Sequence, residues 1–321
     1  MVRKLTLLTG VLVLTGAVAP AASTAAAPSV STDGASRVTP TTARLTGKVN
    51  PQGQSTTYSF QYGTSTRYGA STPAAPAGSG RKAVGAVTDI GGLRPVTTYH
   101  YRIVASSPAG VVSGSDRTFR TAKVPLSLSL TATPNPVSFG LATTLTGQLG
   151  GTGGGGRGIQ VQQNTFPYTA GFANAPVSPV VTGPDGTFSL ALAGLMVNAQ
   201  VRVVTTSGPK LTSAPILVSV SPKVRTAVST RHPRKGRFVR FAGTVTPSWV
   251  PAQVAIQRRG AGGAWVTVAG VVTKGDGPHR ARYAKSARIR RAGTYRVFVG
   301  LLDSRFGPSV GPQIRITPRS R

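Results

Sequence analysis

Acid–base chemistry in this chain would depend on aspartate and histidine, because its 321 residues include no glutamate and no cysteine. Glycoside hydrolysis needs two carboxylates, and general acid–base catalysis needs groups whose surroundings drive their pKa values apart. The aspartates are scattered, and most stand beside Gly or Ser, where Asp favours turns. They are Asp33, Asp89, Asp116, Asp185, Asp276 and Asp303. The sequence therefore predicts a protein that is not an enzyme.

Metal ligation is not expected either. The histidines, His100, His232 and His279, lack the H-x-H or H-x-x-x-H spacing of a metal site, and no run of residues gathers several oxygen ligands for calcium. We expect His100 to point outward from a strand and the other two to lie in basic surface stretches. No catalytic, metal-binding or cofactor-binding residue is predicted, and no cofactor.

Two short motifs resemble catalytic signatures but stand in the wrong context. Gly151, Gly153 and Gly156 match G-x-G-x-x-G, yet residues 159–162 follow as a strand pattern where a dinucleotide-binding fold needs a helix. Residues 307–311 match the G-x-S-x-G of hydrolases, yet Pro312 follows at once and no histidine lies beyond it. We expect a loop at the first motif and a turn between two final strands at the second.

Positive charge is the unusual property of the sequence. Lys and Arg number 37 against six Asp, and 21 of the 37 fall within residues 222–321. In an extended chain Arg280, Arg282, Arg288 and Arg290 share one face, and Tyr283, Ala287 and Ile289 share the other. The candidate polyanion-binding residues are Arg258, Arg259, Arg280, Arg282, Arg288, Arg290 and Arg291. Trp265 is a nearby aromatic that could stack on a sugar or a base.

Two interpretations fit this charge. In the first, the basic region docks on an anionic cell-wall polymer, an acidic polysaccharide, extracellular nucleic acid or a negatively charged membrane surface, because bidentate Arg suits phosphate and carboxylate. In the second, an Arg-rich, Glu-free composition reflects genome bias and keeps the protein soluble. The lack of interleaved aromatic residues argues against a module that reads nucleic-acid sequence.

The elements that would carry these side chains are strands. Gly 40 and Pro 25, abundant Val and Thr, and the absence of Glu predict an all-β chain, and its length suits two or three sandwiches. In the first part, strands are expected over residues 42–49, 57–62, 83–90, 98–105 and 111–119. Tyr99, Tyr101, Ile103 and Ala105 alternate onto one face.

A family resemblance rests on Leu93, Pro95, Thr97 and Tyr99, the L-x-P-x-T-x-Y pattern of fibronectin type III domains. Residues 28–121 resemble such a domain, and residues 46–53, 58–63 and 68–69 resemble a bacterial subgroup of it. The resemblance implies that Tyr99 is a tyrosine corner, with its ring in the core and its hydroxyl bonded to the upstream chain. This domain has no Trp and the chain has no Arg-Gly-Asp triplet, so animal-type adhesion is not carried over.

Residues 122–221 and 222–321 resemble distant copies of each other. Residues 199–203 parallel 293–297, and Asp185-Gly186 parallels Asp276-Gly277 in an equivalent hairpin. Both regions resemble secreted bacterial immunoglobulin-like sandwiches. The predicted fold is thus three tandem β-sandwiches, one fibronectin type III-like and two immunoglobulin-like, joined by short, proline-containing linkers that predict a semi-rigid rod.

The N-terminus indicates export. Arg3 and Lys4, an apolar run over residues 5–16 and a small-residue tail to 27 are typical of a cleaved signal peptide, with the cut near residues 21–26. No integral membrane segment is expected in the mature chain. We expect a secreted structural or adhesion-type protein of a bacterial envelope, either released or associated with the cell surface. The alternative is a carbohydrate- or protein-binding module that uses sandwich-end loops such as residues 166–179. Oligomeric state is not predicted.

Overall fold

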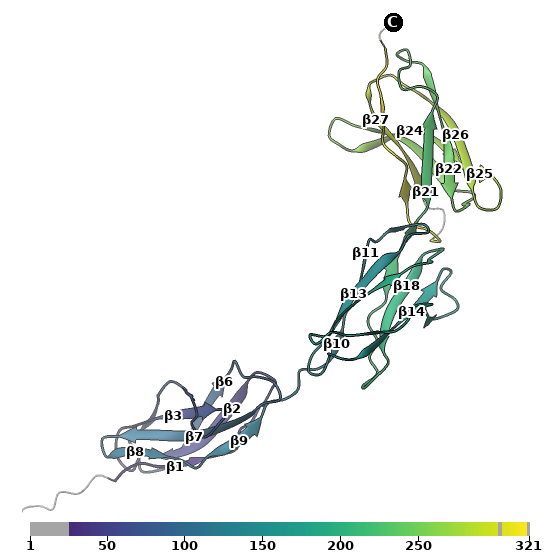
Figure 1. Ribbon diagram of the computed structural model, residues 1–321. Helices are drawn as coiled ribbons and strands as arrows, with labels where there is room; N and C mark the ends of the chain where they lie inside the picture. The colour runs from purple at the N-terminus through teal and green to yellow at the C-terminus, as the bar shows by residue number, and fades with distance from the viewer. Residues whose placement is uncertain (1–25, 301–303, 320–321) are drawn as a thin grey trace, which may run out of the picture. The chain divides into compact units, whose positions relative to one another are not determined.

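The computed structural model describes residues 26–300 and 304–319, and every regular element in those ranges is a β-strand (Figure 1). The chain divides between Lys123 and Val124 into two compact units. The first unit holds one sandwich and the second holds two. The expected signal peptide over residues 1–27 lies almost wholly outside the described residues. Within the described ranges, no helix has the length and apolar character needed to cross a membrane.

The first sandwich packs a three-stranded sheet, β1-β2-β6, against a sheet built on the β3–β7 pair. In the second sheet β4 and β5 flank β3, and β8 and β9 flank β7. Its strands are β1 (Ser29–Thr32), β2 (Ala43–Asn50), β3 (Thr56–Gly63), β4 (Ala70–Ser71), β5 (Ala75–Gly78), β6 (Val84–Ile90), β7 (Thr98–Ser107), β8 (Gly110–Ser113) and β9 (Arg117–Arg120). This is a fibronectin type III-like sandwich.

One expected strand of this sandwich is divided. Residues 111–119 form the end of β8 and the start of β9. The break occurs at Gly114, where a Cβ atom would lie 2.4 Å from the Thr32 hydroxyl oxygen, and where the Gly114 N–H donates to the Ile103 carbonyl at 2.8 Å. A single strand over this stretch was therefore a wrong prediction, because contact with β1 bends the chain there.

The alternation expected in β7 is present. Tyr101, Ile103 and Ala105 are fully buried, and Tyr99 is 7% exposed. The Tyr99 ring stacks on Phe119 with 5.6 Å between ring centroids. Its hydroxyl accepts a hydrogen bond from the Arg94 backbone N–H at 3.0 Å. The inward face of β7 thus supplies the centre of this core.

The second sandwich has one sheet of β10, β11, β13 and β17 and another of β15, β16, β14, β18 and β19, with a parallel β12–β20 pair. Its strands are β10 (Ser127–Leu128), β11 (Thr131–Thr133), β12 (Val137–Ser138), β13 (Thr143–Gly150), β14 (Gly158–Thr165), β15 (Ala173–Asn174), β16 (Val180–Val181), β17 (Thr187–Leu192), β18 (Ala199–Thr205), β19 (Ile216–Val218) and β20 (Val220–Ser221). The glycine run at 151–157 is a loop between β13 and β14, as predicted.

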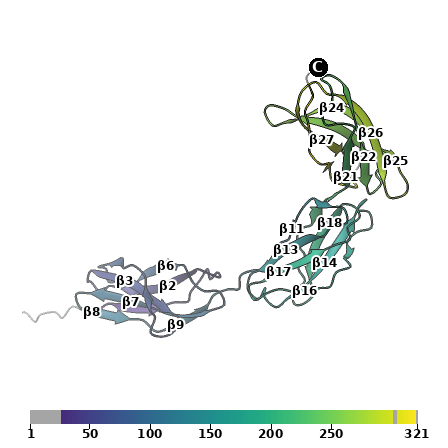
Figure 2. The same ribbon diagram turned by 45° about the horizontal axis from the view of Figure 1, so that its top comes forward.

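The third sandwich pairs the sheet β21-β22-β26-β25 with the sheet β24-β23-β27, which β28 and β29 extend (Figures 1 and 2). Its strands are β21 (Lys223–Val228), β22 (Phe238–Thr246), β23 (Gln253–Arg259), β24 (Trp265–Val272), β25 (Lys274–Gly275), β26 (Ala281–Arg288), β27 (Gly293–Gly300), β28 (Ser309–Val310) and β29 (Ile314–Ile316). Gly186 and Gly277 both adopt positive φ, at 82° and 76°, just before β17 and β26. Both of these sandwiches are immunoglobulin-like.

The G-x-S-x-G motif is part of a strand and not a turn. Ser309 and Val310 form β28, which pairs with β27 through Phe298 and Val299. Ser309 is 7% exposed, and its hydroxyl donates to the carbonyl oxygen of Pro222. The predicted turn was therefore wrong, because the pairing with β27 extends this segment. The serine hydroxyl has a structural partner.

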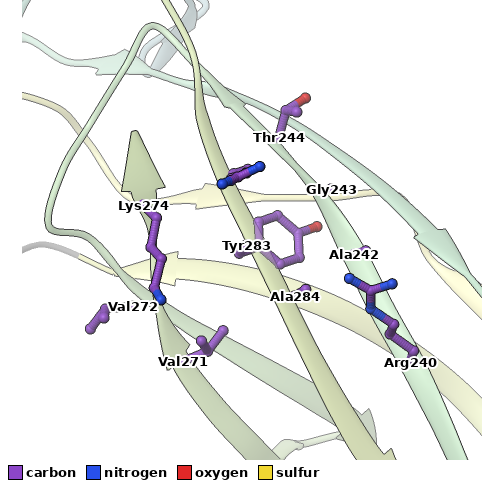
Figure 3. A pocket seen from close by; sticks show the side chains of 10 residues that line it. Arg240, Ala242, Gly243, Thr244, Val271, Val272, Lys274, Tyr283 and Ala284 are labelled. Atoms are coloured by element: carbon purple, nitrogen blue, oxygen red, sulfur yellow. The ribbon is translucent and has the colours of Figure 1, made fainter. Parts of the chain in front are cut away.

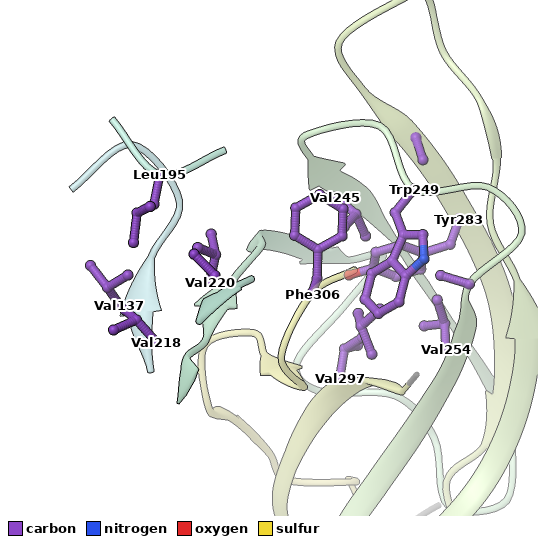
Figure 4. Close-up of a cluster of buried hydrophobic side chains, with 14 of the residues drawn as sticks. Val137, Leu195, Val218, Val220, Val245, Trp249, Val254, Tyr283, Val297 and Phe306 are labelled. Atoms are coloured by element: carbon purple, nitrogen blue, oxygen red, sulfur yellow. The ribbon is translucent and has the colours of Figure 1, made fainter. Parts of the chain in front are cut away.

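Trp249 lies in the core of the third sandwich, where it is 2% exposed (Figure 4). Its ring centroid lies 5.4 Å from that of Phe306. Val254 and Val297 belong to the same buried cluster. The indole contributes through packing, since its Nε1 has no hydrogen-bond partner among the described residues.

Candidate polyanion-binding surface

The outer face of the sheet β21-β22-β26-β25 carries a row of cations. On β26, Arg282 and Arg288 are exposed while Tyr283 and Ala287 are buried, which is the expected alternation. In the registers of this sheet Arg225 pairs with Thr244, Thr244 with Arg282, and Arg282 with Lys274. Directly opposed residues of antiparallel strands point to the same face, with Cβ atoms about 5 Å apart. We call Arg225, Lys274 and Arg282 the cationic row.

A groove of about 540 Å³ lies beside this row (Figure 3). Figure 3 shows Arg240 and Thr244 on one side of β26 and Lys274 on the other. The small side chains of Ala242 and Ala284, which pair across β22 and β26, separate the row from Arg240. The groove therefore has cationic side chains at two borders and small apolar side chains between them.

Tyr283 supports the groove from the inner side of β26. Its hydroxyl donates to the Arg225 carbonyl at 2.9 Å and lies 2.6 Å from the Thr226 hydroxyl. Burial raises the pKa of Tyr283 to about 12, and the Thr226 hydrogen bond opposes that shift. A Cβ atom on Gly243 would lie 2.6 Å from the tyrosine hydroxyl oxygen, so glycine provides the space for this ring. Tyr283 thus links β26 to β21 beneath two residues of the cationic row.

A second groove, of about 580 Å³, has a lining rich in cations. Its lining residues are Lys235, Arg290, Arg291, Ala292, Pro318 and Arg319. Backbone bonds bring these distant segments together: the Arg319 N–H donates to Pro233 at 2.9 Å, and the Gly236 N–H donates to Ile289 at 2.7 Å. Sequence reasoning did not place Lys235 and Arg319 in this site, because only the tertiary pairing joins their segments to residues 290–291.

Few carboxylates oppose these cations. Residues 222–321 contain two aspartates, and within the described residues of this region Asp276 is the only carboxylate side chain. Asp276 lies 3.6 Å from the guanidinium of Arg280, which is one of the expected binding residues. Arg280 is thus the member of the candidate set that has a carboxylate partner, and the positive charge of the remaining face is not compensated by described carboxylates.

Arg258 and Arg259 lie apart from the rest of the predicted set. They end β23, in the opposite sheet of the sandwich. Arg258 is half-buried near Tyr295; burial raises the pKa of Tyr295, and the Arg258 charge opposes that effect. The Tyr295 hydroxyl donates to the Arg291 carbonyl at 3.0 Å, close to the start of β27. The seven predicted arginines therefore do not form one surface.

Three other arginines have repeated structural contacts. In each sandwich an arginine on one long strand donates to a glutamine on its neighbour at 2.9 Å and stacks on an aromatic ring. The sets are Arg102 with Gln61 and Tyr68, Arg202 with Gln162 and Phe172, and Arg296 with Gln257 and Trp265. The Arg296 guanidinium lies 4.1 Å from the Trp265 ring centroid. One face of Trp265 is therefore occupied by protein, which the sequence did not indicate.

An acid–base pair does occur in the first sandwich. His100 Nδ1 lies 2.8 Å from a carboxylate oxygen of Asp116, and the Tyr68 hydroxyl donates to the other oxygen at 3.0 Å. The expectation that His100 simply points outward missed these partners, which the β7–β9 pairing brings together. No serine hydroxyl among the described residues hydrogen-bonds to this imidazole, and no group of three or more His, Asp or Glu residues capable of metal binding occurs within the described ranges.

The aromatic residues of the loop over 166–179 also have partners. The Phe166 and Tyr168 rings meet edge to face at 5.7 Å between centroids, and the Phe172 ring lies under Arg202 at 4.0 Å. Each of these three rings, which an alternative saccharide site in this loop would use, therefore has an intramolecular contact.

No protein-family model matches the chain, and no curated protein matches it. Among solved structures, a run of titin domains matches with a TM-score of 0.37 and 12% identity, over 91% of this chain and 99% of that one. Chicken CNTN1 FN1–FN3 domains match with a TM-score of 0.28 and 13% identity, over 89% and 98%. A tetra-tandem repeat from the extending region of a large adhesion protein matches with a TM-score of 0.28 and 14% identity, over 90% of this chain and 74% of that one. The fold assignment follows from the sheets of this chain itself.

Proposed function

We propose that this chain is a secreted, non-catalytic modular protein of the bacterial cell envelope whose third domain docks on an anionic polymer. The domains span residues 28–121, 122–221 and 222–321 after a signal peptide over 1–27. In this proposal the first two domains act as spacers and the protein works at or outside the cell surface. The third domain supplies an electrostatic anchor.

The cationic row carries the proposal. Arg225, Lys274 and Arg282 come from three strands and share one exposed face, and the groove is lined by Lys274 and Arg282 of the row together with Arg240 of β22. Guanidinium groups bind phosphate and carboxylate through two parallel hydrogen bonds, and clustered positive charge raises the local concentration of anions. Genome bias explains a high arginine content, but it does not by itself explain why cations from three strands adjoin one groove.

The test is to neutralise the row in the full chain. We expect the triple variant Arg225→Gln, Lys274→Gln, Arg282→Gln to bind immobilised poly(glycerol phosphate) about 100-fold more weakly, since each of the three cations near an anionic surface contributes about 1 kcal/mol. The matched control is Arg67→Gln, Arg81→Gln, Lys82→Gln, which removes the same charge from exposed positions in the first sandwich. Equal losses in the two variants would show that net charge matters and this face does not.

We also propose that Tyr99 acts as the tyrosine corner of the first domain, together with Leu93, Pro95 and Thr97. The hydrogen bond from Arg94 to its hydroxyl supports this role, as does the bond from the Thr97 hydroxyl to the Pro95 carbonyl at 3.0 Å. Tyr99→Phe should lower the free energy of unfolding of the first domain by about 1 kcal/mol, because one hydrogen bond is lost. Urea denaturation measures this change in the free energy of unfolding, and Tyr62→Phe on β3 is the control. A Tyr99→Phe variant as stable as the parent would contradict the role.

A further inference from the structure

We infer that the two grooves of the third sandwich are parts of one site, in which a single flexible polyol-phosphate chain lies lengthwise along β26. This inference rests on the proposed function and specifies its ligand and its binding mode. We call the surface the β26 track. It runs from the cationic row to the second groove and has three stations of positive charge.

The stations share one face of one extended segment. Arg282, Ala284, Ser286, Arg288 and Arg290 are exposed alternate residues. The backbone stays extended past the end of β26, because Ile289 exchanges hydrogen bonds with Gly236 and Arg237 at 2.7 and 2.9 Å. With a rise of about 3.4 Å per residue, Arg282 and Arg290 are about 27 Å apart along the strand. A single small anion cannot reach both.

Each station has at least two cations. The first is the cationic row, the middle one has Arg240 and Arg288, and the last has Lys235, Arg290, Arg291 and Arg319. Arg240 pairs with Ser286, one position along the face from Arg288. The Arg288 Nε donates to the Gly236 carbonyl at 2.8 Å. This bond holds the guanidinium on the face and leaves its terminal N–H groups for an anion.

The shape between the stations favours a narrow, flexible ligand. Ala242, Ala284 and Ser286 are small, so a polymer chain can lie close to the sheet between one station and the next. Arginine and lysine along a line match phosphate groups repeated along a chain. Cations that act on one chain also add their contributions through a high effective concentration.

The small number of aromatic residues on the described face of the β26 track favours a polyol phosphate over single-stranded nucleic acid as the ligand. Proteins that bind single strands stack successive bases on several aromatic rings. On this face Phe238, which pairs with Arg288 and is 66% exposed, is one aromatic residue beside the track. Trp265 belongs to the opposite sheet and stacks with Arg296. The track thus offers many charges and a single stacking surface.

The experiment is a length series with the full chain at low salt. Poly(glycerol phosphate) of about 2 and about 12 repeats is titrated at equal phosphate concentration, so that the short oligomer is below and the long one within the size of single-strand sites, about 4–16 units. We expect the long oligomer to bind at least about tenfold more tightly, because only it spans the stations. Arg290→Gln with Arg319→Gln should weaken binding of the long oligomer about tenfold and change binding of the short one less than twofold. Thermal melts check that the variants stay folded.

The outcomes separate this inference from the proposed function. If neither oligomer binds, both ideas fail. If short and long oligomers bind equally per phosphate, or if the end variant weakens both equally, the track is wrong and docking on the face stands. Oligothymidylate with the same number of phosphates is the second arm. Tighter binding of oligothymidylate that Phe238→Ala abolishes would overturn the choice of polyol phosphate in favour of nucleic acid.

Discussion

Replacing Trp249 with alanine is expected to destabilise the third sandwich by about 3–5 kcal/mol, the usual cost of removing a large buried aromatic side chain. The indole is 2% exposed and packs against Phe306 in the buried cluster. For a domain of about 100 residues this loss should lower the melting temperature by at least about 12 °C. Urea and thermal denaturation of the full chain measure it.

The matched control is Trp265→Ala, since the chain has two tryptophans. Trp265 is partly exposed on the outer side of its sheet and loses mainly its contact with Arg296. A cation–π contact at such a site contributes about 0.5–1 kcal/mol, so the loss should be several-fold smaller than for Trp249. Each variant leaves one fluorescent indole that reports unfolding of the same sandwich. Equal losses from the two substitutions would contradict the described core.

Raising the salt concentration from about 50 to about 200 mM should weaken binding of long poly(glycerol phosphate) about 100-fold. The reason is counterion release. The logarithm of the binding constant falls with the logarithm of salt with a slope of about −0.7 per neutralised charge on a flexible strand. We expect about five of the track cations, the three of the cationic row among them, to neutralise a phosphate in the proposed complex. Titrations of the full chain at several salt concentrations measure the slope.

Binding by the triple variant of the cationic row should depend less steeply on salt. Replacing Arg225, Lys274 and Arg282 with glutamine should reduce the magnitude of the salt slope by about 2, whereas the matched control variant should keep the slope of the parent. A neutral saccharide site in the loop over 166–179 would respond little to salt, because no counterions are released there. Binding that stays constant across this salt range would therefore refute the electrostatic anchor and support the loop.

The strands were predictable because a strand has a period of two side chains. Tyr101, Ile103 and Ala105 alternate with polar residues in the sequence and are buried in the structure, and Arg282 and Tyr283 follow the same rule in β26. The Asp-Gly turns were predictable for a similar local reason, since Gly186 and Gly277 adopt a conformation that few other residues tolerate. Each of these features depends on neighbours a few residues away. The equivalent hairpins were predicted wrongly, because only Asp276-Gly277 joins paired strands, β25 and β26, whereas β16 and β17 pair with strands of different sheets.

The candidate site was predicted only in part. Residues on one strand were assigned to the same face, but Arg258 and Arg259 were grouped with them by charge alone and lie on the other sheet. Lys235 and Arg319 were not among the seven candidate binding residues, although both line the second groove. The pairing of His100 with Asp116 was missed as well, because it crosses from β7 to the segment before β9.

The sequence by itself determined the all-β class, the alternation of buried and exposed side chains, and the concentration of positive charge in residues 222–321. These properties are local or compositional. Only the tertiary structure decided which cations face the same groove, which arginines have glutamine and aromatic partners, and which serine and histidine already have hydrogen-bond partners. Strand order and register set those contacts, and they join residues tens of positions apart whose relation no local pattern records.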